Sequence, residues 1–281
     1  MSRHQVVAVL GRGVVPPDTP VLPVTDRGVL HGDGLFETMH VRDGRPWLAH
    51  QHLDRLRGAA KAVALPLPAP ADLAALLAET CAGWPAGMEG ALRLVCTRGA
   101  EGGGAGTVFT TLSEVEPGLV RARRAGITVA TLPLGVAATA RAGALWLLAG
   151  IKSTSYAANL ASRRWAAANG FDDVLWTSTD GYALEGPTAN LVWLDGDVLC
   201  TVPADRTGIL PGITARWLLD HAATLGWSAA ERMVTPDELR DGGGVWLTSS
   251  VRGLAEIRSL DGNALPPSPH TAMIRQLLGF T

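Results

Sequence analysis

The sequence predicts an α+β protein built from two domains. Its 281 residues are enough for two domains of moderate size. Hydrophobic residues make up 47% of the chain and charged residues 18%, as in ordinary globular proteins. A polar stretch bounded by proline and glycine, PGLVRARRAG, separates two halves that both contain strand and helix patterns. We therefore expect an N-terminal α+β domain over residues 1–117, an interdomain linker over 118–126 and a second domain over 127–281.

The first half combines helices with an antiparallel sheet. The stretch LFETMHV, then Asp43-Gly44, then PWL predicts a hairpin, because Asp-Gly is a favoured two-residue turn. Apolar residues at helical spacing predict the helices. The glycine-rich segment AEGGGAG joins the last two strands. Strands are expected over residues 5–10, 35–41, 46–48, 90–99 and 106–115, and helices over about 50–63 and within 69–83.

The second half contains strands separated by Asp-Gly turns and helices that begin after glycine or proline. The Asp-Gly turns are Asp180-Gly181 and Asp195-Gly196. Strands are expected over 127–134, within 172–202 and within 244–262, and helices over about 156–169, within 210–226 and over about 269–279.

Composition excludes several classes of protein. A formal net charge of −2 without a long charged block gives no reason to expect a nucleic-acid or membrane partner. The three cysteines are too few and too scattered for a disulfide framework, and they form no C-x-x-C pair that would hold zinc, so no metal site is expected. The N-terminus lacks the apolar run of a signal peptide, and no stretch is long enough to span a bilayer. We expect a cytoplasmic protein.

Lys152 stands out within the apolar, small-residue stretch LLAGIKSTSY. The chain has only two lysines, Lys61 and Lys152, against twenty-two arginines. Arginine is always charged, whereas a lysine among apolar groups can become a neutral nucleophile. A lysine whose head group reaches water from a strand end is the structural alternative.

Three further features, taken together with Lys152, indicate one kind of chemistry. Glu185 follows a strand and precedes a Gly-Pro turn in YALEGPTAN. GILPGITARW predicts a turn followed by the start of a helix. The free backbone N–H groups at a helix start favour binding of a phosphate. LTSSV clusters three hydroxyls after a strand. An amine, a carboxylate and a phosphate cradle are what pyridoxal 5′-phosphate requires.

The sequence resembles the fold-type IV (class IV) pyridoxal-phosphate aminotransferase family along nearly its whole length. DRGVLHGDGLFETMHVRDGRPWLAHQHLDRL is similar to the family's N-terminal signature, and GIKSTSYAANLASRRWAAANGFDDVLWTSTDGYALEGPTANLVWL to its lysine-to-glutamate core. GILPGITARWLL and WLTSSVRGL follow in the family's order. The resemblance implies a smaller N-terminal α+β domain and a larger C-terminal cofactor domain with a barrel-like mixed sheet flanked by helices. It also implies a homodimer.

The resemblance also assigns roles to individual residues. Lys152 would form the aldimine and act as the base, and Glu185 would contact the pyridine nitrogen. Asn190 is open to two interpretations, support of the Glu185 turn and an ordinary structural role, of which the structural role is favoured. The phosphate would be held by Arg55, Ile213, Thr214, Ser249 and Ser250, the ring would pack on Leu210, and Tyr156 would approach the phenolic oxygen.

The resemblance leaves the reaction open between two outcomes that share the aldimine and quinonoid steps. A 4-amino-4-deoxychorismate lyase, which releases 4-aminobenzoate and pyruvate for folate synthesis, is favoured by the glycine-rich loop after TRG. That loop lacks the Pro-Arg-x-His sequence of D-amino-acid transaminases. The alternative is a branched-chain, D-amino-acid or R-selective amine transaminase, and a non-catalytic binding module is disfavoured by the motifs. Candidate residues near the substrate are Thr38, His31, Arg98 and Arg252. The alternative for Arg98 and Arg252 is that they are ordinary surface arginines, and the alternative for His31 is simple packing.

Overall fold

The computed structural model describes residues 4–103 and 106–280, and the chain divides into two compact units. Unit 1 comprises Met1–Glu116 together with Ile151–Tyr156. Unit 2 comprises Pro117–Gly150 and Ala157–Thr281. The first boundary therefore lies one residue from the expected end of the N-terminal domain, but Lys152 belongs to unit 1.

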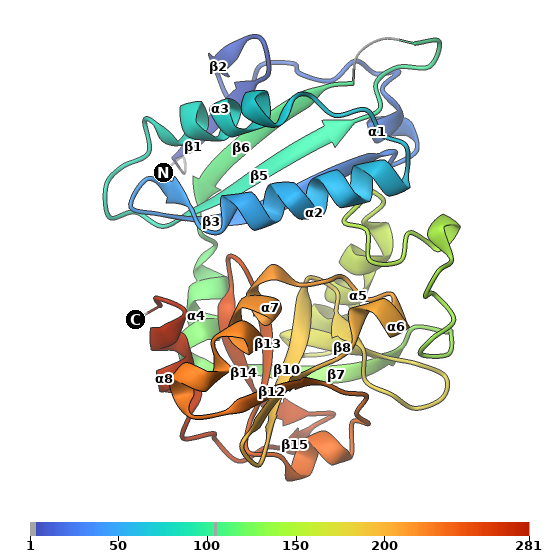
Figure 1. Ribbon diagram of the computed structural model, residues 1–281, viewed down its shortest axis with the longest axis vertical. Coiled ribbons are helices and arrows are strands. Elements are labelled where there is room, and N and C mark those ends of the chain that lie inside the picture. Colours follow the sequence, from blue (N-terminus) through green and yellow to red (C-terminus); the bar gives the residue numbers. More distant parts are fainter. Residues whose placement is uncertain (1–3, 104–105, 281) are drawn as a thin grey trace. The chain divides into compact units, whose positions relative to one another are not determined.

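Unit 1 is built on a six-stranded antiparallel sheet with the order β2-β1-β6-β5-β3-β4 (Figure 1). The hairpin between β3 and β4 turns at Asp43 and Gly44, whose φ angles of 50° and 69° are those a tight hairpin turn requires. The strands are β1 (Gln5–Val9), β2 (Gly13–Val15), β3 (Gly34–Arg42), β4 (Arg45–Pro46), β5 (Gly90–Thr97) and β6 (Val108–Glu114).

The longer helices of unit 1 cover one face of this sheet. Helix α2 (Ala49–Ala62) packs on β3, and α3 (Pro70–Cys81) packs on β1 and β6, while α1 (Arg27–Leu30) is a single turn before β3. Buried Leu56 and Ala60 of α2 meet Leu35 and Met39 of β3 in one apolar core. The alternation of strand side chains therefore puts Leu35, Glu37 and Met39 toward the helices.

The segment Ile151–Tyr156 runs along the first half of β3. The Phe36 N–H donates to the Lys152 carbonyl (3.0 Å), and the Thr154 N–H donates to the Gly34 carbonyl (2.8 Å). The hydroxyls of Thr154 and Ser155 donate to the Gly32 carbonyl. Gly32 has a φ of +66°, and a Cβ there would lie 2.6 Å from the Ser155 hydroxyl, so only glycine allows this approach.

Unit 2 is built on a nine-stranded mixed sheet with the order β12-β11-β10-β13-β14-β7-β8. Short β9 pairs with β10, and the Leu184 N–H next to it donates to the Trp176 carbonyl of β8 (2.8 Å), so the sheet curves back on itself. The strands are β7 (Ile127–Pro133), β8 (Asp173–Thr177), β9 (Glu185–Gly186), β10 (Ala189–Asp195), β11 (Val198–Thr201), β12 (Ser228–Glu231), β13 (Val245–Ser249), β14 (Gly253–Leu260) and β15 (Asn263–Ala264).

Helices flank the sheet of unit 2 (Figure 1). Helices α4 and α8 pack on β14, α5 packs on β8, and α7 packs on β13. Their bounds are α4 (Pro117–Ala125), α5 (Ala157–Ala168), α6 (Ala204–Thr207), α7 (Ile213–Asp220) and α8 (Thr271–Leu277), with 3-10 turns η1 (Leu145–Leu147), η2 (Ala222–Leu225) and η3 (Glu238–Asp241). The expected α+β class, with a smaller sheet first and a barrel-like mixed sheet second, is confirmed.

Most of the expected linker, residues 118–126, is helical and belongs to α4. Arg123, within this polar stretch, is buried. Its guanidinium donates to the carbonyls of Val251 (2.5 Å) and Arg252 (2.9 Å) and lies 4.2 Å from the Phe280 ring centroid. These partners lie more than 120 residues away in sequence, so a local reading of RARR could not find them.

Among residues 4–103 and 106–280, no helix is both long enough and apolar enough to cross a bilayer.

Candidate active site

Lys152 lies on the face of the unit 1 sheet opposite its helices. Its Nζ is 4.4 Å from the centroid of the Phe36 ring and 5.4 Å from that of Tyr156. The two rings meet edge to face, with centroids 5.1 Å apart. A cation over aromatic faces is attracted by their negative π surfaces, so the rings hold the amine in place. Tyr156 thus meets the amine through its ring.

The same face carries Thr38 and Arg93. Thr38 follows Phe36 by two residues on β3, which places both on one side of the sheet. Arg93 on β5 lies directly opposite Thr38, and its Cζ is 5.2 Å from the Phe36 ring centroid. Arg93 is exposed, and apart from that ring it has no partner among the described residues. Sequence reasoning missed it, although the alternation of buried Leu92 and Leu94 around it was the available signal.

Arg55 belongs to a buried polar cluster on the helix side of the sheet. Its Nε donates to Oε1 of Glu37 (2.8 Å) and its Nη2 to Oε2 (2.6 Å). His52, one helical turn earlier on α2, donates from Nδ1 to Glu37 Oε2 (2.7 Å), because a carboxylate only accepts. Glu37 and His52 are 1% and 0% exposed. Neither residue was singled out from the sequence.

The electrostatics of this cluster keep Glu37 ionised. Burial alone would raise the pKa of Glu37, but the charge of Arg55 and the hydrogen bonds from His52 and Arg55 outweigh it and lower the pKa to about 2. Burial lowers the pKa of His52, and the opposing effect of Glu37 does not reverse this. The cluster is therefore one carboxylate, one guanidinium and one neutral imidazole.

In unit 2, Glu185 is buried at β9 beside the turn that precedes α7. The Leu210 N–H donates to both carboxylate oxygens, each at 3.2 Å. Asn190 Nδ2 lies 3.5 Å from Glu185 Oε2 and donates to the Leu210 carbonyl at 2.8 Å. Asn190 therefore ties Glu185 to the Leu210 turn. A Cβ at Gly212 would collide with the Asn190 side chain, so the turn needs glycine there.

The start of α7 meets the β13–β14 turn. Ile213 and Thr214 are the first two residues of α7, and their N–H groups have no intrahelical acceptor. The Thr214 and Ser250 hydroxyl oxygens are 3.5 Å apart, and Ser249 ends β13 just before. Unit 2 thus brings together two backbone amides and neighbouring hydroxyls, which is a donor set suited to a phosphate.

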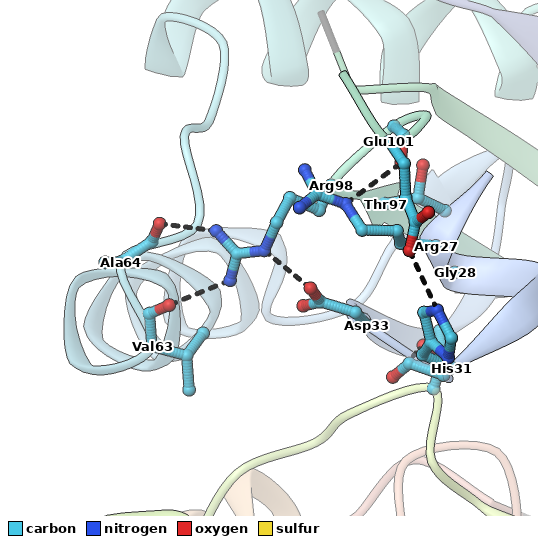
Figure 2. Close-up of polar contacts among 12 residues, drawn as sticks. Arg27, Gly28, His31, Asp33, Val63, Ala64, Thr97, Arg98 and Glu101 are labelled. Carbon is cyan, nitrogen blue, oxygen red and sulfur yellow. Dashed lines mark hydrogen bonds and ion pairs between the residues drawn. The ribbon is translucent and has the colours of Figure 1, made fainter. Parts of the chain in front are cut away.

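The Arg98 side chain binds the backbone just after the C-terminal end of α2. Its Nη2 and Nη1 donate to the carbonyls of Val63 (2.9 Å) and Ala64 (2.7 Å), and its Nε to Asp33 (2.6 Å). Figure 2 shows the guanidinium turned toward these three partners. Val63 and Ala64 are the two residues that follow α2, so Arg98 fixes the chain where the helix ends. These contacts give Arg98 a structural role, and its expected contact with a substrate stays a prediction.

His31 and the glycine-rich loop lie near Arg98. His31 Nε2 is 3.3 Å from Glu101 Oε1, and both side chains are exposed (Figure 2). Gly104 and Ala105, in the loop that the sequence reading associated with a lyase, lie outside the described residues.

Arg252 is buried in unit 2 and paired with Asp173. Its Nη2 lies 2.6 Å from Asp173 Oδ2, and the side chains are 5% and 0% exposed. A buried guanidinium held by a carboxylate positions its own chain segment. The observed partner of Arg252 is therefore a carboxylate of its own unit, and its expected contact with a substrate carboxylate stays a prediction.

Comparison with known proteins identifies related chains. A model of the amino-transferase class IV family matches residues 34–260. The bifunctional aminodeoxychorismate lyase / D-amino acid transaminase of Mycobacterium tuberculosis (strain ATCC 25618 / H37Rv) is 37% identical over 280 residues, which is 97% of each chain.

Two solved structures are similar over nearly the whole chain. The PLP-bound form of a hypothetical aminotransferase from Mycobacterium tuberculosis has a TM-score of 0.94 at 36% identity, covering 98% of both chains. A fold IV-transaminase from Curtobacterium pusillum has a TM-score of 0.91 at 36% identity, covering 98% of this chain and 97% of that one. With the match over residues 34–260, these similarities show that the chain belongs to the class IV aminotransferase family of pyridoxal-phosphate-dependent enzymes.

Proposed function

We propose that the chain is a pyridoxal-phosphate lyase that converts 4-amino-4-deoxychorismate to 4-aminobenzoate and pyruvate. The observation that carries the lyase proposal is the glycine-rich loop after TRG, which lacks the Pro-Arg-x-His sequence of D-amino-acid transaminases. The pairing of Lys152 and Arg93 around the Phe36 ring supports a substrate that has both an amine and a carboxylate. A reactive amine and a cation available to a carboxylate thereby share one face of unit 1. The substrate is a primary amine with carboxylates on its ring and on its enolpyruvyl group, so this pair matches its chemistry.

Each unit supplies donor groups of a kind that pyridoxal phosphate requires. Lys152 would hold its aldehyde carbon, and buried Glu185 its pyridine nitrogen, with Asn190 and Leu210 keeping the carboxylate in place. The α7 amides, Thr214, Ser249, Ser250 and Arg55 would hold the phosphate, Leu210 would lie against the ring, and Tyr156 would approach the phenolic oxygen. When bound, the cofactor supplies an electron-accepting ring that stabilises negative charge on the substrate carbon.

The protein's own residues handle the proton and the substrate charge. The Lys152 Nζ, freed when the substrate amine replaces it, accepts the proton from the carbon that bears the amino group. Glu185, as a carboxylate, favours a protonated pyridine nitrogen. Arg93 attracts a substrate carboxylate, and the Thr38 hydroxyl opposite it can donate to the same group.

Transamination of D-amino acids is the second candidate function. The name of the Mycobacterium tuberculosis relative combines the lyase with a D-amino acid transaminase. A D-alanine aminotransferase from Bacillus licheniformis is 27% identical over 269 residues. Transaminase and lyase use the same amine and carboxylate, so the residues described above serve both reactions.

The decisive experiment compares the two reactions in one preparation. With aminodeoxychorismate, we expect 4-aminobenzoate and pyruvate in equal amounts. With D-alanine and 2-oxoglutarate, the second candidate predicts pyruvate and glutamate. Rapid amino transfer without lyase turnover would contradict the first proposal.

A separate experiment tests the cofactor chemistry. Borohydride reduction of the holoenzyme, followed by peptide mass spectrometry, should find a pyridoxyl group on Lys152 and none on Lys61. A Lys152→Ala variant should lose turnover in both reactions. A cofactor attached to another residue, or full activity in the variant, would contradict the assignment of Lys152 as the residue that binds the cofactor.

We also propose that the chain forms a homodimer. Exposed apolar side chains support this, since Leu145, Trp146 and Leu147 of η1 are 44%, 82% and 47% exposed. Exposed apolar clusters of this kind mark association surfaces. Light scattering should give twice the chain mass. A Trp146→Ser variant should dissociate into monomers at a higher protein concentration than the wild type does. A wild-type protein that is monomeric at every concentration would contradict this proposal.

A cytoplasmic location stays a prediction. Cys81, Cys96 and Cys200 are buried free thiols, as suits a reducing compartment. Burial raises the pKa of Cys81 to about 11 and of Cys96 to about 12. Both therefore stay protonated and unreactive at neutral pH.

A further inference from the structure

We propose that Glu37, supported by His52, is a positioning residue that sets the Arg55 guanidinium for the cofactor phosphate. This inference rests on the proposed function, because Arg55 is there assigned to the phosphate. It adds to that function two residues that contact Arg55 from the interior of unit 1.

The geometry of the pair fixes both the plane and the direction of the guanidinium. Nε and Nη2 of Arg55 form two parallel hydrogen bonds to the two oxygens of Glu37, at 2.8 Å and 2.6 Å. A two-point contact restricts rotation of a planar group, whereas a single contact would let it swivel. This contact uses two of the five guanidinium N–H donors of Arg55.

His52 fixes the carboxylate in turn. Its Nδ1 donates to Glu37 Oε2 at 2.7 Å, on the oxygen that also accepts from Arg55 Nη2. His52 and Glu37 are almost completely buried, while the Arg55 side chain is 12% exposed. The cluster is therefore anchored from the interior and open to solvent only at Arg55.

Orientation and charge predict opposite effects of removing Glu37. If only charge mattered, loss of a carboxylate beside Arg55 would strengthen phosphate binding. Glu37→Gln, however, replaces one acceptor oxygen by an NH₂ group that faces the donors of His52 and Arg55. Buried donors left without acceptors are costly, so the guanidinium has to turn away to find new partners. We expect this loss of orientation to outweigh the gain in net positive charge.

The test measures the contribution of the phosphate alone. Apoenzyme is titrated with pyridoxal 5′-phosphate and with pyridoxal, which lacks the phosphate, and the ratio of the two dissociation constants is compared among variants. For Glu37→Gln we expect the preference for the phosphorylated form to fall about tenfold, the size of one lost charge-assisted hydrogen bond, with pyridoxal affinity nearly unchanged. Binding of inorganic phosphate to the apoenzyme, followed by calorimetry, should weaken in parallel.

Two variants of His52 provide the matched control. Asn at position 52 can place an N–H donor near the position of Nδ1, so His52→Asn should keep the wild-type ratio. His52→Leu removes the donor and should lower the ratio. This pair decides the question if Glu37→Gln does not fold.

The outcomes separate this inference from the proposed function. An unchanged or raised ratio in Glu37→Gln would overturn the positioning role, as would an equal loss of affinity for both ligands. If Glu37→Gln does not fold, equal ratios in His52→Leu and His52→Asn overturn it. A wild-type protein that binds pyridoxal 5′-phosphate no better than pyridoxal contradicts the phosphate assignment itself, and with it the proposed function.

Discussion

Arg93 and Thr38 lie directly opposite each other on strands β5 and β3, on the face of the sheet that carries Lys152. Arg98, five residues after Arg93, is instead bound to Asp33 and to the end of α2. The two arginines are therefore expected to have separable functions. We expect Arg93 to serve the substrate and Arg98 to serve the fold.

Replacing Arg93 should impair catalysis without affecting stability. We expect Arg93→Gln to lower kcat/KM for a carboxylate-bearing substrate by roughly 10- to 100-fold, the size of a lost charge-assisted contact. The free energy of unfolding should change by less than about 0.5 kcal/mol, because the side chain is exposed and makes no hydrogen bond or ion pair among the described residues. Steady-state kinetics and urea unfolding measure the two effects. An unchanged kcat/KM would remove Arg93 from the substrate site.

Replacing Arg98 should do the reverse. Arg98→Gln leaves the carbonyls of Val63 and Ala64 without their guanidinium donors and Asp33 without its cation. We expect a loss of about 1–3 kcal/mol in the stability of unit 1. The relative kcat/KM values for different carboxylate substrates should stay those of the wild type. A changed substrate preference at unchanged stability would restore the role that the sequence suggested for Arg98.

Sequence patterns predicted the local elements because their causes are local. The helix expected at 50–63 is observed as Ala49–Ala62, and the Asp43-Gly44 hairpin forms where turn chemistry requires it. For Asn190 the sequence left open support of the Glu185 turn and an ordinary structural role. The structure adds a hydrogen bond from Asn190 to the Leu210 carbonyl twenty residues later.

Contacts between segments far apart in the chain could not be predicted from the sequence. Residues 151–156 pair with β3 more than 100 residues earlier, which no periodicity reveals. Arg98 and Arg252 are arginines near family motifs, but their partners, Asp33 and Asp173, are fixed only by the tertiary fold. A charged residue in a motif can therefore be assigned to substrate or to structure only once its partners are known.

Asn190 should matter to the cofactor through Glu185. Asn190→Ala removes the donor to the Leu210 carbonyl and the amide beside Glu185 Oε2. Both acceptors are then less well oriented, and we expect cofactor affinity to fall about tenfold. Absorbance titration of the apoenzyme measures this. Asn190→Asp brings a second carboxylate near Glu185 and should weaken binding further, so a variant with unchanged affinity would contradict the supporting role.

Arg252 should act on stability through Asp173. Arg252→Met leaves a buried carboxylate without its cation, which costs about 3–5 kcal/mol of stability. Asp173→Asn in the same chain removes that charge and should recover most of the loss. Urea unfolding of the wild type, the single variant and the double variant forms the test. A single variant as stable as the wild type, but with a raised KM, would return Arg252 to the substrate.

The buried imidazole of His52 predicts a local pH dependence in unit 1. Burial lowers the pKa of His52, and the charges around it are Glu37, Arg55 and Lys152. Its folded-state pKa is below the ordinary value of 6.5. The unfolded chain therefore takes up a proton first as the pH falls. The stability that neutral His52 allows is fully present above about pH 6.5 and is lost below it, at no more than about 1.4 kcal/mol per pH unit.

A His52→Asn variant isolates this effect, because asparagine does not titrate and the other histidines are common to both proteins. Hydrogen exchange of the β3 and α2 amides, corrected for intrinsic rates, should show the wild type losing more opening free energy than the variant between pH 7.5 and pH 5. The two proteins should behave alike above pH 7. If their opening free energies fall in parallel below pH 6.5, then His52 is not the titrating group, and the neutral state assigned to its cluster with Glu37 and Arg55 is wrong.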